Sequence, residues 1–128
     1  MQAKGMIKIY DIYFYEDKDG FSPVYDYIQT LSQKTDKDSR INHKKINDYI
    51  QVLSLHGKAA GEPYIKHIVD EIWELRPIRG RIFFASWTEN GFILLHYFQF
   101  KKTQKTPKRE IEQAKRNLQS IRERDESQ

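Results

Sequence analysis

Basic side chains gather in one stretch of this chain, between Trp73 and Arg109. The stretch holds eight lysines and arginines against the two acids Glu74 and Glu89, a balance of +6 in a chain whose total is +4. The basic residues are Arg76, Arg79, Arg81, Lys101, Lys102, Lys105, Lys108 and Arg109. They interrupt apolar runs typical of strands, so we expect a cationic surface on a rigid sheet. Such a surface suits a polyanion, and RNA is the one we favour.

Arg76 and Arg81 flank a short connection over residues 77–80, where they are expected to close one strand and open the next. Both can therefore point at one phosphate on the sheet surface. The fork of donors on a guanidinium matches phosphate oxygens, and fixed cations stabilise charge that develops in a transition state. We predict that these arginines bind the scissile phosphate. The alternative is that either one pairs with Glu74 or with a neighbouring acid.

His96 is the candidate for proton transfer, because an imidazole titrates near neutrality. It lies in the middle of the segment I-L-L-H-Y-F. Strand alternation places it on one face with Leu94 and Phe98, and leaves Leu95 and Tyr97 on the other. A histidine satisfied within the core is an equally good interpretation.

Contacts with the RNA backbone and bases are expected around this catalytic set. Arg79, in the connecting turn, is a candidate for a backbone contact. Tyr97 and Trp73 are candidates for stacking on bases, although most aromatic side chains of this chain must be needed in its core.

The remaining basic residues surround the end of the last predicted strand and the start of the last helix. Lys101 and Lys102 follow the strand, where they would face a bound backbone. Lys105, Lys108 and Arg109 flank the N-terminus of the helix, whose backbone N–H groups favour anions. A solvated helix start is an equally good interpretation of these last three.

The elements that must position these residues can be read from periodicity and turn signals. Ser22–Pro23 begins a helix, Gly57 ends another, and Asn90–Gly91 marks a hairpin. The pattern predicts a strand over 6–15, helices over 23–34 and 37–56, β-rich segments over 64–76, 81–88 and 91–100, and a last helix from about 106 with a frayed tail at 122–128. We therefore predict a single α+β domain over residues 1–128, with an antiparallel sheet covered on one face by helices.

Four words of the sequence, W-E-L-R, G-R-I-F-F, I-L-L-H and K-K-T-Q-K-T-P-K-R-E-I-E-Q-A, resemble the HigB-type toxins of the RelE superfamily. These are small bacterial and phage proteins that cleave mRNA and are encoded beside an antitoxin. The resemblance is strongest over residues 70–117 and implies a RelE-like fold: an N-terminal strand, two helices, about three further antiparallel strands and a C-terminal helix. The predicted order of elements agrees.

The resemblance also implies roles for particular residues. The arginines of E-L-R and G-R are Arg76 and Arg81, and Lys101 and Lys102 are residues of the active surface. The segment Gln99–Phe100 makes the spacing one residue longer than the F-x-K-K of the pattern. A shift of one residue exchanges the faces of a strand unless a bulge at Gln99 or Phe100 absorbs it. Which lysine faces the RNA is therefore left open.

The function implied by the resemblance is that of a metal-independent endoribonuclease that cleaves mRNA in the ribosomal A site, with the ribose 2′-OH as nucleophile and no cofactor. The implied partners are the ribosome and a helix-turn-helix, HigA-like antitoxin. Operator DNA would be bound only through the complex with that antitoxin.

Three other classes of function are rivals of this interpretation. Asp70, Glu71 and Glu74 lie close in sequence and could hold a hard cation in a metal-dependent nuclease. The same basic surface would also serve a non-catalytic nucleic-acid binder or translation inhibitor that occupies a ribosomal site. A structural or regulatory partner protein is the third class, and it predicts no growth inhibition when the protein is expressed alone.

The composition excludes cysteine chemistry and bears on the location of the protein. The chain has no cysteine, which excludes disulfides and thiolate chemistry. It shows neither a signal peptide nor an apolar run long enough for a membrane span, so a cytoplasmic location is expected.

Overall fold

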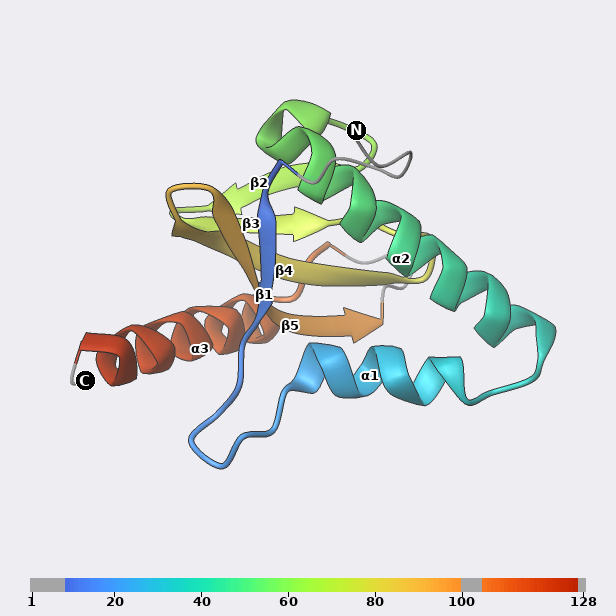
Figure 1. Ribbon diagram of the computed structural model, residues 1–128, viewed down its shortest axis with the longest axis horizontal. Coiled ribbons are helices and arrows are strands. Elements are labelled where there is room, and N and C mark those ends of the chain that lie inside the picture. Colours follow the sequence, from blue (N-terminus) through green and yellow to red (C-terminus); the bar gives the residue numbers. More distant parts are fainter. Residues whose placement is uncertain (1–8, 100–104, 127–128) are drawn as a thin grey trace, which may run out of the picture.

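A computed structural model describes residues 9–99 and 105–126 of the chain (Figure 1). The elements are β1 (Asp11–Phe14), α1 (Pro23–Ser32), α2 (Lys37–His56), a short 3-10 helix (Gly57–Ala60), β2 (Ile65–Val69), β3 (Ile72–Leu75), β4 (Gly80–Thr88), β5 (Gly91–Gln99) and α3 (Lys108–Glu126). The predicted α+β class, with an N-terminal strand and a C-terminal helix, is confirmed and is consistent with a RelE-like fold. None of the described helices is long and apolar enough to cross a membrane.

The helix boundaries follow from their capping residues. Ser22 Oγ accepts a hydrogen bond from the Tyr25 amide at the start of α1, and Asp36 Oδ2 accepts one from the Ser39 amide at the start of α2. Gly57 ends α2 with a φ of 58°, a conformation that favours glycine. The predicted start of α1 and both ends of α2 are confirmed.

The sheet has five strands in the order β1-β5-β4-β3-β2. The segment predicted as one strand over residues 64–76 is two, β2 and β3, which pair antiparallel across a turn at Asp70 and Glu71. Asp70 has a φ of 50°, which lets the chain reverse there. Four strands therefore follow the helices where about three were expected, because the first predicted β-rich segment is a hairpin.

The strand pairing departs from the prediction at one edge. β1 pairs parallel with β5, whereas the other neighbouring strands are antiparallel. The sheet is therefore mixed. The hairpin predicted at Asn90–Gly91 is confirmed, because Thr88 of β4 pairs with Gly91 of β5.

Helices cover both faces of the sheet (Figure 1). α1 and α2 pack through Val24 and Leu53 on the face that carries Phe84 and Leu94. On the other face, α3 packs against Phe83 and its neighbours in a second core cluster. The prediction that helices cover one face only is wrong, since apolar periodicity along a helix does not say which face of a sheet it meets. We call these the α1/α2 face and the α3 face.

A bulge in β5 changes which residues share a face. Phe83 pairs with His96 and Phe84 pairs with Leu94, so Leu95 has no opposite residue in β4. Leu94 belongs to the cluster on the α1/α2 face, and Leu95 belongs to the cluster on the α3 face. His96 also faces α3, where it contacts Glu110. The prediction that His96 shares a face with Leu94 is therefore wrong.

The last helix is longer than predicted. α3 continues to Glu126, and Arg122 forms two hydrogen bonds with the carboxylate of Glu71. Arg124 donates to the backbone oxygen of Glu16 at 2.6 Å. The predicted frayed tail from residue 122 is thus wrong for residues 122–126, because side-chain contacts hold the end of the helix to the body of the protein.

Candidate active site

A buried carboxylate lies between two arginines on the α3 face. Glu74 of β3 is 2% exposed. Its Oε2 lies 3.4 Å from Nε of Arg76 and 3.7 Å from Nε of Arg81, and its Oε1 accepts a hydrogen bond of 3.1 Å from Thr106. We call Glu74, Arg76 and Arg81 the carboxylate–arginine cluster. The pairing with Glu74 that the sequence allowed as an alternative is present for both arginines.

The two arginines of the cluster differ in accessibility. The side chain of Arg81 is 8% exposed, and its Nη1 donates to the backbone oxygens of Pro77 at 3.0 Å and Gly80 at 2.9 Å. The side chain of Arg76 is 26% exposed and also lies 3.7 Å from the exposed carboxylate of Glu62. Arg81 therefore braces the β3–β4 connection from within, and Arg76 is the arginine that a ligand can reach.

Burial governs the electrostatics of the cluster. It raises the pKa of Glu74, and the opposing effects of Arg81, the Thr106 hydrogen bond and Arg76 are smaller. Burial likewise lowers the pKa of Arg81, against the attraction of Glu74. For both partners the loss of hydration outweighs their mutual attraction, as is common for buried ion pairs. Because two guanidinium groups share one carboxylate, the cluster keeps an excess of positive charge.

His96 forms a second polar contact on the same face. Its Nε2 lies 2.7 Å from Oε1 of Glu110, the third residue of α3, and both side chains are about one-fifth exposed (18% and 20%). The ring lies nearly parallel to that of Phe83, with an angle of 9° between their planes. When Nε2 donates to Glu110, Nδ1 remains as a proton acceptor. His96 is therefore neither a purely apolar core residue nor fully open to solvent.

Basic residues at the N-terminal end of α3 extend this surface. Lys105, Lys108 and Arg109 are exposed, and Nε of Arg109 lies 3.6 Å from Oε2 of Glu110. Arg79 is also exposed, and its Nη2 lies 3.4 Å from Oδ1 of Asp38 on α2. The structure therefore adds accessible cations beside the His96–Glu110 pair, and places Arg79 in a weak surface ion pair.

The sequence model of one protein family, described as "Phage derived protein Gp49-like (DUF891)", matches residues 26–119, well over half of the chain. This chain belongs to the Gp49-like family. The family is associated with RelE-type, toxin-like proteins. The comparison with curated proteins gives no match. The matched region of this Gp49-like chain includes the whole carboxylate–arginine cluster and the His96–Glu110 pair.

The structure does not bring Tyr97 to this site. Tyr97 lies on the opposite, α1/α2 face, stacked on Tyr27 with ring centres 3.7 Å apart and planes at 13°. Burial, followed by the neighbouring Tyr27, raises the pKa of its hydroxyl. Trp73 is on that face too, beneath the ammonium of Lys58. To stack on a base bound at the candidate site, either ring would have to lie on the α3 face of the sheet.

Lys101 and Lys102 lie outside the residues that the structure describes, as does Phe100. The described part of β5 carries its bulge at Leu95, and Gln99 is regularly paired with Gly80. A bulge at Gln99 is therefore not found, and the question of which lysine faces the RNA stays open. The predicted roles of the two lysines stay predictions.

The three carboxylates of the metal-nuclease hypothesis do not converge. Glu71 binds Arg122 on α3, and Asp70 lies 3.2 Å from Lys115, whereas Glu74 is buried in the cluster. Among the described residues, no group of three or more histidine, cysteine or acidic side chains is placed to hold a metal ion. Although these three acids are close in sequence, their side chains do not form a shared site.

Two residues of the site were missed by sequence reasoning. Glu110, the partner of His96, follows the basic run in the motif K-T-P-K-R-E, and Thr106, the donor to Glu74, precedes it in the same motif. Their distance in sequence from β3 and β5 gave no sign of these contacts. One signal was available: the motif lies at the start of a helix that directly follows a strand. Such a helix start must pack near the end of that strand, so polar residues of the motif could have been expected beside β5.

Proposed function

We propose that this Gp49-like protein is the toxin of a type II toxin–antitoxin pair and an endoribonuclease that cleaves mRNA at the ribosome without a metal ion. The observation that carries the proposal is the common position of the carboxylate–arginine cluster and the His96–Glu110 pair on one sheet face. This face therefore combines an accessible guanidinium with an imidazole oriented by a carboxylate. Groups of these two kinds accelerate phosphodiester cleavage by the 2′-OH, the first by stabilising charge and the second by transferring protons.

The reaction follows from the groups available. The ribose 2′-OH attacks the adjacent phosphorus while its proton passes to a base, and the bond from phosphorus to the 5′ oxygen breaks as that oxygen gains a proton. The products are a 2′,3′-cyclic phosphate and a 5′-hydroxyl. In this scheme Arg76 binds a phosphate oxygen and stabilises the charge of the transition state, with Lys101 and Lys102 adding positive charge.

His96 serves as the proton-transfer group in this proposal. Glu110 fixes the orientation of its ring, a role that an acidic partner commonly plays for a catalytic histidine. General acid–base assistance of this kind typically accelerates a reaction by about a hundred- to ten-thousand-fold.

Arg81 takes a different role from the one that the sequence suggested. Its guanidinium is covered and holds the backbone of residues 77 and 80, so we treat it as a positioning residue. It holds the buried carboxylate of Glu74 in place on the α3 face, and Glu74 in turn holds the guanidinium of Arg76.

The basic residues beyond this centre serve binding in the proposal. Lys105, Lys108, Arg109 and Arg79 contact the RNA backbone or the ribosome. A helix-turn-helix, HigA-like antitoxin neutralises the protein, and operator DNA is bound only by the complex of the two.

The test is induced expression of the full chain in a bacterial host, with the 5′ ends of cellular mRNA mapped. Wild type is compared with Arg76→Ala, whose side chain is partly exposed, and with Arg116→Ala, an exposed arginine of α3 bonded to Gln113. We expect growth arrest and new cuts inside translated frames with wild type and Arg116→Ala, and at least about a hundredfold fewer cuts with Arg76→Ala.

The same experiment separates the rivals. Arrest without new cuts would identify a non-catalytic ribosome blocker, and Arg76→Lys would then retain activity because charge alone suffices. Cuts with 5′-phosphate ends, or cleavage by the purified protein that EDTA abolishes, would overturn the metal-independent mechanism.

A further inference from the structure

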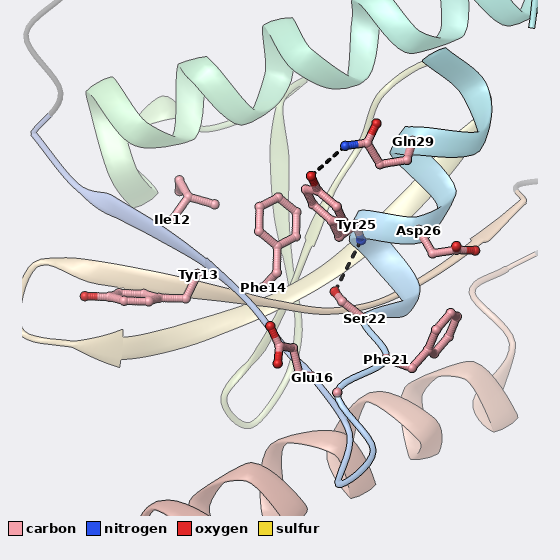
Figure 2. Close-up of a pocket in the computed structure, with 10 residues that line it drawn as sticks. Ile12, Tyr13, Phe14, Glu16, Phe21, Ser22, Tyr25, Asp26 and Gln29 are labelled. Carbon is pink, nitrogen blue, oxygen red and sulfur yellow. Dashed lines mark hydrogen bonds between the residues drawn. The ribbon is translucent and has the colours of Figure 1, made fainter. Parts of the chain in front are cut away.

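A pocket of about 710 Å³ lies between the outer edge of β1 and the first turns of α1. Figure 2 shows its walls: Phe14 of the strand lies beside Tyr25 of the helix, and their rings meet edge to face with centres 5.5 Å apart. The pocket opens to solvent on aromatic side chains, because Phe21 is 50% and Tyr25 is 49% exposed. We call this pocket with β1 the aromatic edge.

Among the described residues, no strand pairs with the side of β1 that runs along this pocket. β1 is an outer strand of the described sheet and pairs with β5 on one side. The amides of Asp11 and Tyr15 donate toward the β4–β5 hairpin, to Asn90 and Leu94. By the alternation of a strand, the N–H and C=O groups of Ile12 and Phe14, which both line the pocket, therefore face the open side.

The other outer strand shows that this openness is not shared by both edges. β2 carries the exposed Lys66 and His67, and its pairing with β3 is interrupted by a bulge between His67 and Val69. Charged side chains and bulges are the ordinary means of preventing an edge from pairing with another chain. β1 has one charged residue, Asp11 at its first position, and neither a lysine nor a bulge among its described residues, so its edge along Ile12 and Phe14 is left able to accept a strand.

The charges around the pocket select among possible occupants. Its lining includes two acids, Glu16 and Asp26, and neither a lysine nor an arginine, although the chain as a whole is basic. A nucleic acid would be repelled by these carboxylates. A second copy of this chain would place the same acids against them in a symmetric pairing. An extended segment with apolar side chains between basic ones is matched to both the rings and the carboxylates.

We propose that the aromatic edge binds a partner protein through such a segment, which adds a strand to β1 and seats its apolar side chains in the pocket. This surface is distinct from the carboxylate–arginine cluster on β3 and β4. The proposal does not depend on ribonuclease activity, and each can fail without the other.

The probe is a capped synthetic peptide, Arg-Thr-Val-Thr-Ile-Thr-Arg, in which alternate residues place valine, isoleucine and both arginines on one side of a strand. Its counterpart has glutamate at both ends. Each is titrated into the full-length chain, and backbone amide shifts are followed by NMR. We expect the arginine peptide to shift and protect the amides of Ile12 and Phe14, and the glutamate peptide to bind at least about tenfold more weakly.

A charge reversal gives the matched control. Asp26→Lys should weaken binding of the arginine peptide at least about tenfold. Asp48→Lys makes the same change on α2, outside the pocket, where Asp48 has an exposed ion pair with Lys44. This variant should bind like wild type.

Several outcomes would overturn the proposal. The proposal fails if both peptides bind equally well, or if neither peptide binds. It also fails if the amide shifts centre on Arg76 instead of β1. Sedimentation that shows a concentration-dependent dimer, with the amides of Ile12 and Phe14 protected, would identify a second copy as the occupant instead.

Discussion

The carboxylate–arginine cluster and the aromatic edge use the same sheet in opposite ways. The cluster buries charge, with Glu74 2% and the side chain of Arg81 8% exposed. The aromatic edge exposes apolar surface, with Phe21 and Tyr25 about half exposed. Each reverses the usual distribution of polar and apolar groups, which is the kind of departure that indicates a purpose beyond packing. Substitutions in the two regions should therefore affect stability differently. Removing the partner of a buried charge is costly, whereas removing an exposed ring changes the free energy of unfolding little.

The family match separates the two regions as well. Residues 26–119 include the cluster and the His96–Glu110 pair, whereas β1 and the pocket residues up to Tyr25 precede the matched region. The proposed chemistry therefore rests on the part of the chain that the Gp49-like family describes. The proposed partner surface rests mostly on the part that it does not describe.

The largest expected effect is on stability, from the loss of the carboxylate in the cluster. Glu74→Ala removes the acceptor for Thr106 and the buried carboxylate that lies beside the guanidinium of Arg81. We expect the free energy of unfolding to fall by about 3 kcal/mol or more, as for other broken buried pairs. Urea denaturation followed by circular dichroism measures it.

Two variants make this prediction specific. Glu74→Gln keeps the volume and one oxygen acceptor, so it should cost much less than Glu74→Ala. Asp26→Ala, an exposed carboxylate of the aromatic edge, should cost below about 1 kcal/mol. Equal costs for Glu74→Ala and Asp26→Ala would show that burial of charge does not distinguish the two regions.

A smaller effect is expected in the pH dependence of stability. Burial raises the pKa of Glu74 above its ordinary value of 4.5, so at pH values between 4.5 and the raised pKa the folded state holds a proton that the unfolded state has lost. The stability of wild type relative to Glu74→Gln should therefore fall as pH rises from about 4.5 through the raised pKa. Thermal unfolding of both proteins between pH 4 and 8 measures the difference.

Glu71, on the same β2–β3 hairpin, should show the opposite dependence of stability on pH. Its hydrogen bonds with Arg122 lower its pKa, so the stability from this pair is present above about 4.5 and lost as pH falls through the lowered value. The contribution should be small, since both side chains are substantially exposed. A parallel trend for Glu71→Gln and Glu74→Gln would contradict the assignment of burial as the cause at Glu74.

Local signals predicted the fold where they were sufficient by themselves. Ser22–Pro23 predicted the start of α1, Gly57 predicted the end of α2, and Asn90–Gly91 predicted the β4–β5 hairpin. The turn at Asp70 was missed because it uses a positive φ at a residue other than glycine. The parallel pairing of β1 and the face chosen by α3 depend on contacts between distant segments, which local periodicity does not encode.

The candidate site was predictable in its members more than in its geometry. The sequence placed Arg76 and Arg81 together and offered Glu74 as a possible partner, and the structure unites all three. It did not reveal how deeply Arg81 is buried. The orientation of His96 depends on the bulge at Leu95, which exists only in relation to the facing strand. Strand alternation therefore placed Phe98 and Tyr97 correctly but exchanged the faces of Leu94 and Leu95.

The smallest expected effect on stability comes from the aromatic edge, and it sharpens the comparison most. Tyr25→Ala removes a half-exposed ring that contacts Phe14 and accepts a hydrogen bond from Gln29. We expect a loss of about 1 kcal/mol or less in the free energy of unfolding, but a loss of at least about tenfold in affinity for the arginine peptide. Tyr25→Phe keeps the ring and removes only the hydroxyl, so it should retain most of both. If Tyr25→Ala instead destabilised the fold as much as Glu74→Ala, the ring would be part of the core, and its exposure would no longer support a role in binding a partner.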